Sequence, residues 1–135
     1  MITQDQYFAG YRGHPGIQIP HRLAAGILLN LVNRLLDAYV ADGGELHTNG
    51  ATGCLIGGQK NGGWRPSDCK VGSAQSSHKT GRGVDIYDPF DELDRWLDDK
   101  KLAEFKLYRE HPSETHTWVH LTDRPPASGK RTFMP

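Results

Sequence analysis

Two short segments of this 135-residue chain carry the residues best suited to chemistry. The first runs from Ser76 to Tyr87, and its glycines permit a sharp turn between His78 and Asp85. Val84 and Ile86 alternate with Asp85, as in a strand with one buried face, so the carboxylate would stand on the opposite face. The turn could therefore bring the imidazole of His78 back to this carboxylate.

The second segment covers residues 117–121, where side chains again alternate as they do in a strand. His120 would stand on the face away from the core, beside Trp118, whose ring could wall a cleft or simply pack. If the two strands are neighbours, Asp85 and His120 lie opposite each other with their Cβ atoms about 4.5–5.5 Å apart. Two imidazoles and one carboxylate would then converge.

Two imidazoles and a carboxylate suit a catalytic zinc ion, which binds three protein ligands and keeps a fourth position open for water. Such a site lowers the pKa of its water to about 7 and polarises a carbonyl group, which is the chemistry of a hydrolase. The alternative is a set of histidines that are only hydrogen-bonded, and spacing alone does not decide between the two. Cys54 and Cys69 lack metal-ligand spacing, and we interpret them as free or packed thiols.

Other segments must position these residues. Residues 22–39 have apolar side chains at three-and-four spacing between a proline and a glycine pair, which predicts an amphipathic helix. Residues 88–101 show similar spacing, with acidic residues early and lysines late, and predict a second helix. The Gly-rich and Asn-rich residues 44–63 indicate short strands and turns, and a surface loop begins at Pro125.

Length and composition predict one domain over residues 1–135. The 16 Lys and Arg balance the 16 Asp and Glu, which argues against a polyanion such as nucleic acid as partner. We expect no membrane insertion, because no apolar run approaches the roughly 20 residues that cross a bilayer. The start of the chain lacks the features of a signal peptide, so we expect synthesis in a cytosol.

The chemistry-bearing residues lie in motifs that resemble those of a known family, the hedgehog-type D-alanyl-D-alanine metallopeptidases. This family includes vancomycin-resistance dipeptidases and many phage endolysins. The motifs span residues 63–121, and they read Gly63-Trp64-Arg65-Pro66, Ser76-x-His78-x-x-Gly81-x-x-x-Asp85 and Trp118-x-His120.

The resemblance implies an α+β domain whose antiparallel sheet carries a zinc site on one face, with helices packed on the other. His78, Asp85 and His120 would bind one Zn²⁺ per chain. Arg65 would hold a carboxylate or carbonyl of the substrate, which suits its planar fork of donors. Ser76 would hydrogen-bond near the zinc or the substrate, or else cap a loop.

The catalytic base is where the sequence departs from the family pattern. The dipeptidases place a Glu three positions before the last zinc ligand, and that position here is Thr117, which cannot act as a base at neutral pH. Other branches place the acidic group six positions before, which makes Glu114 the first choice. Glu110, His111 and His116 are competitors, because all precede His120 on what could be a loop over the metal.

The resemblance thus predicts a monomeric zinc peptidase that cleaves the peptide stem of bacterial peptidoglycan, as a phage or prophage lysis enzyme. The bond would be D-Ala-D-Ala or L-Ala-D-Glu. The enzyme would be made in the cytoplasm and reach the cell wall after release, or be carried on a virion. The alternative is a hedgehog-like binding or structural module that keeps the zinc without turnover.

Overall fold

The structure, a computed structural model, describes all 135 residues, and its centre is a four-stranded sheet. The strands lie in the order β1-β3-β2-β4, and their bounds are Gly83–Tyr87 (β1), Tyr108–Glu110 (β2), Trp118–Thr122 (β3) and Thr132–Phe133 (β4). Strand β3 pairs antiparallel with both β1 and β2, whereas β4 pairs parallel with β2.

The sheet is therefore mixed, and the prediction of a purely antiparallel sheet is wrong at β4. After β3 the chain turns back, but both edges of β3 are already occupied by β1 and β2. Strand β4 can only add outside β2. Because β2 and β4 both run opposite to β3, they pair parallel to each other.

The chain forms four α-helices, with bounds Gln4–Phe8 (α1), Ile19–Ala41 (α2), Glu92–Trp96 (α3) and Asp99–Glu104 (α4). Helix α2 confirms the helix predicted over residues 22–39. The predicted helix over 88–101 is two helices, because Leu97 is extended and the carboxylate of Asp98 accepts the backbone N–H of Lys101 at 2.8 Å to begin α4. Residues 44–63 form turns with isolated bridges.

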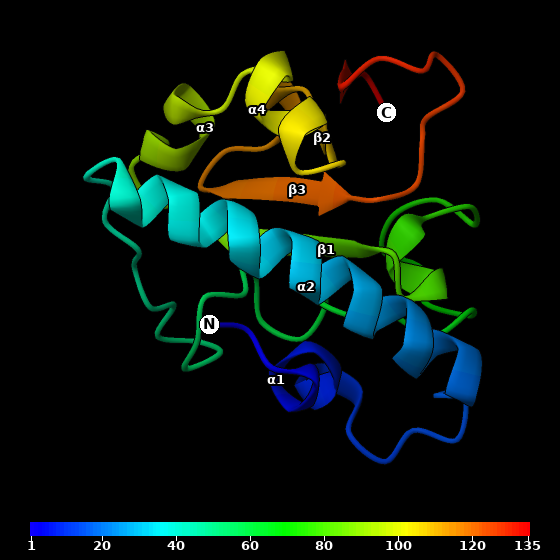
Figure 1. The fold of residues 1–135 in the computed structure, drawn as a ribbon. Coiled ribbons are helices and arrows are strands. Elements are labelled where there is room, and N and C mark those ends of the chain that lie inside the picture. The colour runs from blue at the N-terminus through cyan, green and yellow to red at the C-terminus, as the bar shows by residue number, and fades with distance from the viewer.

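Helix α2 crosses one face of the sheet and buries the core against it (Figure 1). On the strands the alternation has the predicted sense, since Val84 and Ile86 of β1 and Val119 and Leu121 of β3 are fully buried. Leu28, Val32, Leu35 and Leu36 of α2 are fully buried in the same cluster. The chain is thus a small single-domain α+β protein, and the other face of β1 and β3 is left for polar side chains.

Helix α2 is long and apolar enough, by length and composition, to cross a membrane. The expectation that no stretch of the chain reaches that length and apolarity is therefore wrong. Core helices of water-soluble proteins meet the same criteria, and in this structure α2 contributes seven buried residues to the domain.

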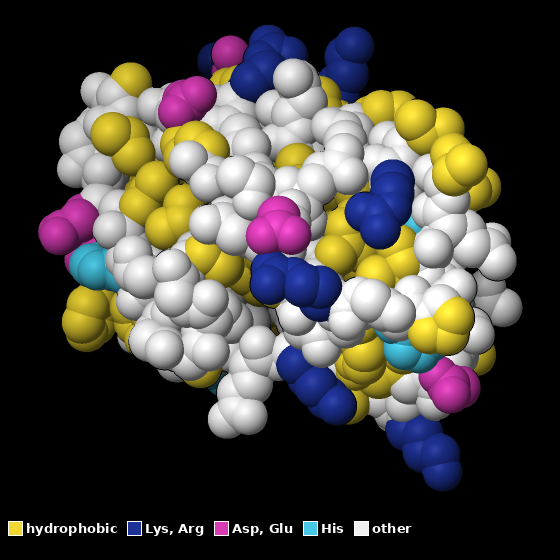
Figure 2. Space-filling model, turned by 90° about the horizontal axis from the view of Figure 1, so that it is seen from below, with side chains coloured by type: hydrophobic (Ala, Val, Ile, Leu, Met, Phe, Trp, Pro, Cys, Tyr) yellow, Lys and Arg dark blue, Asp and Glu magenta, His cyan; other side chains and the backbone are white.

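Charged side chains of both signs are interspersed with apolar ones on the surface shown in Figure 2. Neither the basic nor the acidic residues cover that face. This distribution agrees with the balance of 16 basic and 16 acidic residues in the chain.

The packing of α2 predicts very different effects for two leucines on the same helix. Leu35→Ala should lower the free energy of unfolding by about 2–5 kcal/mol, because Leu35 is 0% exposed and its truncation leaves a cavity. Leu23→Ala should change it by less than about 0.5 kcal/mol, because Leu23 is 67% exposed. Urea unfolding in the presence of a chelator measures both, and equal losses would contradict the described packing.

Candidate metal centre

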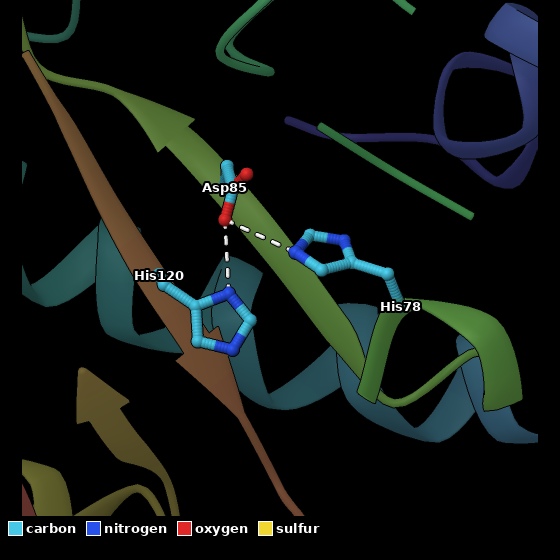
Figure 3. A group of neighbouring side chains, drawn as sticks. All are labelled: His78, Asp85 and His120. Carbon is cyan, nitrogen blue, oxygen red and sulfur yellow. Dashed lines mark hydrogen bonds and ion pairs between the residues drawn. The ribbon is translucent and has the colours of Figure 1, made fainter. Parts of the chain in front are cut away.

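His78, Asp85 and His120 come together from three elements, as Figure 3 shows. Asp85 is the central residue of β1, and the register of the sheet places it directly opposite His120 of β3. His78 lies on the short 3-10 helix Ser77–Thr80, which ends at Gly81 with a positive φ of 79°. A Cβ at Gly81 would lie 2.7 Å from the carbonyl oxygen of His21, so the turn that returns His78 to the strand needs a glycine.

The three side chains share one carboxylate oxygen. Oδ1 of Asp85 lies 2.9 Å from Nδ1 of His120 and 3.2 Å from Nε2 of His78. One potential ligand atom from each residue lies within 4.8 Å of the others, and all three side chains are largely buried. The cluster could therefore hold a metal ion, with two nitrogen donors and one oxygen donor.

The remaining ring nitrogens are held by partners outside the cluster. Nδ1 of His78 lies 2.7 Å from the carbonyl oxygen of Gly63, which can only accept, so in the neutral ring Nδ1 carries the proton and Nε2 is the nitrogen available to a metal ion. Nε2 of His120 lies 3.2 Å from the hydroxyl of Ser77, which leaves Nδ1 directed at Asp85. Metal-binding histidines are oriented by such outer hydrogen bonds.

Gly63 is itself fixed by the N-terminal segment. The backbone N–H of Trp64 donates to the carbonyl oxygen of Tyr7 at 3.1 Å, and a Cβ on Gly63 would overlap that same oxygen. The hydroxyl of Tyr7 donates to the carbonyl oxygen of Gly83 at 2.8 Å, next to the start of β1. Helix α1 is thus tied to both the turn and the strand that carry the site.

Burial and pairing act in opposite directions on the ionisation of the cluster. Burial alone would raise the pKa of Asp85, but the charge and hydrogen bonds of His78 and His120 outweigh it and lower the pKa below its usual range. Burial lowers the pKa of His78, and the attraction of Asp85 offsets this only in part. An ionised carboxylate beside a neutral imidazole is the state in which both can bind a metal ion.

Arg65 lies in the site, but its nitrogens already have partners. Nε donates to the carbonyl oxygen of Asn61 at 2.7 Å, Nη1 to that of Val71 at 3.2 Å, and Nη2 to Oδ2 of Asp85 at 3.5 Å. Arg65 is also buried. In this arrangement its guanidinium holds the turn and the second oxygen of Asp85, and only what remains of its donor capacity can reach a substrate.

The cluster opens into a cavity of about 580 Å³. Besides the three ligand candidates, its walls include Arg65, Ser76, Glu110, Trp118 and Arg124. Ser76 accepts the backbone N–H of His78 at 3.3 Å, which is the capping role that the sequence analysis left open. Arg124 is the second arginine of this cavity, and its Nη2 donates to the carbonyl oxygen of Gln75.

Only one of the four residues considered as a base lines this cavity, and it is Glu110. The pairing of Arg109 with Leu121 places Glu110 next to His120 along the same register, on the site face of the sheet. Burial raises the pKa of Glu110, and the charge of His120 lowers it in part.

The other three candidates lie elsewhere. Glu114 is exposed on the 3-10 helix Pro112–Glu114 and does not line the cavity, although its charge reaches Glu110. The exposed ring of His111 pairs with Ser113, and His116 lines a different cavity. The structure thus brings Glu110, and not the first choice Glu114, to the metal centre.

The sequence analysis assigned no role to Ser77 or Arg124. Ser77 directly precedes the first ligand, but nothing in the sequence shows which of two adjacent serines reaches His120. Arg124 lies 59 residues from Arg65, and only the fold brings the two into one cavity. Both cysteines are free, and neither lines this cavity.

No family model, curated protein or solved structure matches this chain.

The hydrogen bonds to the two histidines predict how metal affinity responds to the substitution of two serines that line the same cavity. Ser77→Ala should weaken binding of a transition-metal ion about 10–100-fold, because His120 loses the partner that orients its ring. Ser73→Ala should leave affinity unchanged, because Ser73 is exposed and touches neither histidine. Titration with Co²⁺ followed by its visible absorption measures both. Asp85→Ala should abolish binding, and equal affinities of the two serine variants would contradict the proposed ligand orientation.

Proposed function

We propose that this chain is a zinc-dependent peptidase that acts on the peptide stem of bacterial peptidoglycan. The observation that carries the proposal is the convergence of His78, Asp85 and His120 in the wall of an open cavity. Two imidazoles and one carboxylate are a common ligand set of catalytic zinc, and the cavity gives access to a water molecule and a substrate. The peptidoglycan assignment is supported by the motifs that resemble the D-alanyl-D-alanine metallopeptidases.

His78, Asp85 and His120 would hold Zn²⁺, which when bound lowers the pKa of water and polarises a carbonyl group. In the proposed reaction the oxygen of a water molecule attacks the carbonyl carbon of the scissile amide. As it does so, a carboxylate oxygen of Glu110 accepts a proton from this water. Glu110 then returns this proton to the nitrogen of the leaving amine as the C–N bond breaks. The products are a free carboxylate and a free amine.

The walls of the cavity suit a peptide that carries carboxylates. Arg65 and Arg124 both line it, and an arginine can donate two parallel hydrogen bonds to one carboxylate. Because Arg65 is largely engaged with Asp85 and two carbonyl oxygens, Arg124 is the better placed of the two to receive a carboxylate of the stem. Trp118 would form an apolar wall. The scissile bond would be D-Ala-D-Ala or L-Ala-D-Glu.

The proposed enzyme is a monomer that is made in the cytoplasm and meets the cell wall after release, or that travels on a virion. The competing proposal is a zinc-stabilised, hedgehog-like module without turnover, which the threonine at position 117 favours because the commonest base of the family is absent there. The position of Glu110 supports the enzyme, because it supplies a carboxylate from a neighbouring strand instead.

Digestion of purified peptidoglycan tests the proposal directly. The zinc-loaded protein should release stem fragments whose masses identify the bond, and a chelator or His78→Ala should stop the release. Fragments that appear equally with the chelator and with His78→Ala would exclude the metallopeptidase. Bound zinc without any fragment would favour the module.

Substitution of two glutamates distinguishes the proposed base, Glu110, from its competitor, Glu114. Glu110→Gln should keep zinc and lower kcat about 10²–10⁴-fold, because a glutamine cannot take the proton of the attacking water. Glu114→Gln should change kcat less than about twofold, since Glu114 is exposed outside the cavity. Steady-state kinetics on a stem peptide, with zinc content measured in parallel, gives both results. The reverse order would return the role to Glu114.

A further inference from the structure

A second group of potential ligands lies where the chain passes from the end of β1 into α3, and it plays no part in the proposed reaction. Asp88, Asp91 and Asp94 each place a carboxylate oxygen within 4.8 Å of the others. Asp88 and Asp94 are buried and Asp91 is half-buried. None of the three lines the cavity of the histidine site.

The hydrogen bonds of this group leave one buried oxygen without a partner. Asp88 accepts the backbone N–H groups of Leu93 and Asp94, at 3.1 and 3.0 Å. Oδ1 of Asp94 accepts Nη1 of Arg109 at 3.1 Å, but its Oδ2 has no hydrogen-bond partner, although Asp94 is only 6% exposed. A buried carboxylate oxygen without a partner is costly, so a ligand for it is expected.

The charges in this group do not balance. Arg109 compensates one of the three carboxylates, and Arg95 and His116, which line the same cavity as Asp91 and Asp94, are both exposed. Nη1 of Arg95 donates to the carbonyl oxygen of Phe90. Burial and the like charges of Asp88 and Asp91 raise the pKa of Asp94 to about 6, although Arg109 lowers it in part.

We propose that Asp88, Asp91 and Asp94 form a second metal site, which binds a hard divalent cation of the calcium type. All the donors are oxygens, and Ca²⁺ takes six to eight oxygen ligands in flexible geometry. Asp91 and Asp94 line an open cavity of about 340 Å³, in which water can complete the coordination. The cation would take the free oxygen of Asp94 and reduce the repulsion among the three carboxylates.

Such a cation would also connect two segments of the chain. Oδ1 of Asp91 accepts the backbone N–H of Thr117 at 3.3 Å, and the N–H of Asp88 donates to the carbonyl oxygen of Thr117 at 2.9 Å. Thr117 ends the loop between Glu110 and β3, the strand that carries His120. Cation binding would therefore hold this loop in place from the side remote from the histidine site.

Thermal unfolding with added Ca²⁺ tests the second site. The protein is first saturated with Zn²⁺ and dialysed, so that the histidine site is not open to the probe. Calcium at about 100-fold over its Kd should raise the Tm of the wild type by about 5–10 °C. Asp37→Asn, which removes an exposed acid elsewhere on the surface, should respond like the wild type, whereas Asp91→Asn should lose the response.

The variant Asp91→Asn keeps an oxygen that can accept the N–H of Thr117, so its metal-free fold is preserved. Without calcium its Tm should equal or exceed that of the wild type, because one of three like charges is gone. With calcium its Tm should be lower than that of the wild type. Asp94→Asn should show the same reversal. A lower Tm both with and without calcium would indicate a purely structural role and overturn the proposal.

Isothermal titration with Ca²⁺ gives the second readout. The wild type and His78→Ala should bind calcium equally, because the two sites share no residue. Absence of binding to the wild type, or unchanged binding to Asp91→Asn, would overturn the proposal. Loss of binding in His78→Ala would place the ion at the histidine site instead. Neither result depends on peptidase activity, so the proposal can fail while the proposed function holds.

Discussion

The pairing of β1 with β3 is the interaction on which the metal centre depends. This register sets Asp85 opposite His120 and buries Val84, Ile86, Val119 and Leu121 under α2. A slip of one residue in either strand would turn that strand's ligand candidate into the core and its aliphatic side chains toward the cavity. The hydrophobic effect that stabilises the domain therefore also selects the geometry of the site, because both depend on one alternation of side chains.

Two features of the backbone position His78 beside this pair of strands. The carbonyl oxygen of Gly63 fixes the proton on His78, and the left-handed turn at Gly81 returns His78 to the strand. Side chains of buried residues then hold the ligands in turn, as Ser77 does for His120 and Arg65 does for Asp85. A cluster held in this way would lose little conformational entropy on binding an ion.

The sequence was sufficient for the parts of the fold and site that follow from local pattern. Alternation around Asp85 and His120 predicted both strands and the face on which the ligands lie, and apolar spacing predicted α2. It could not predict that β4 adds parallel to β2, because that depends on which edges of the sheet are free. The spacing seen in other branches of the resembled family favours Glu114 over Glu110, because spacing along the chain says nothing about a register partner on a neighbouring strand.

The hydrogen bonds of Tyr7 make the N-terminal segment part of the support of the candidate metal centre, although it is distant in sequence. Its carbonyl oxygen packs against Gly63 and accepts from Trp64, and its hydroxyl holds Gly83. Through Gly63, Tyr7 is therefore linked to His78, whose Nδ1 faces the carbonyl oxygen of Gly63. Helix α1 thus braces both the turn and the strand on which His78 and Asp85 stand, so residues far from the cluster in sequence belong to its support.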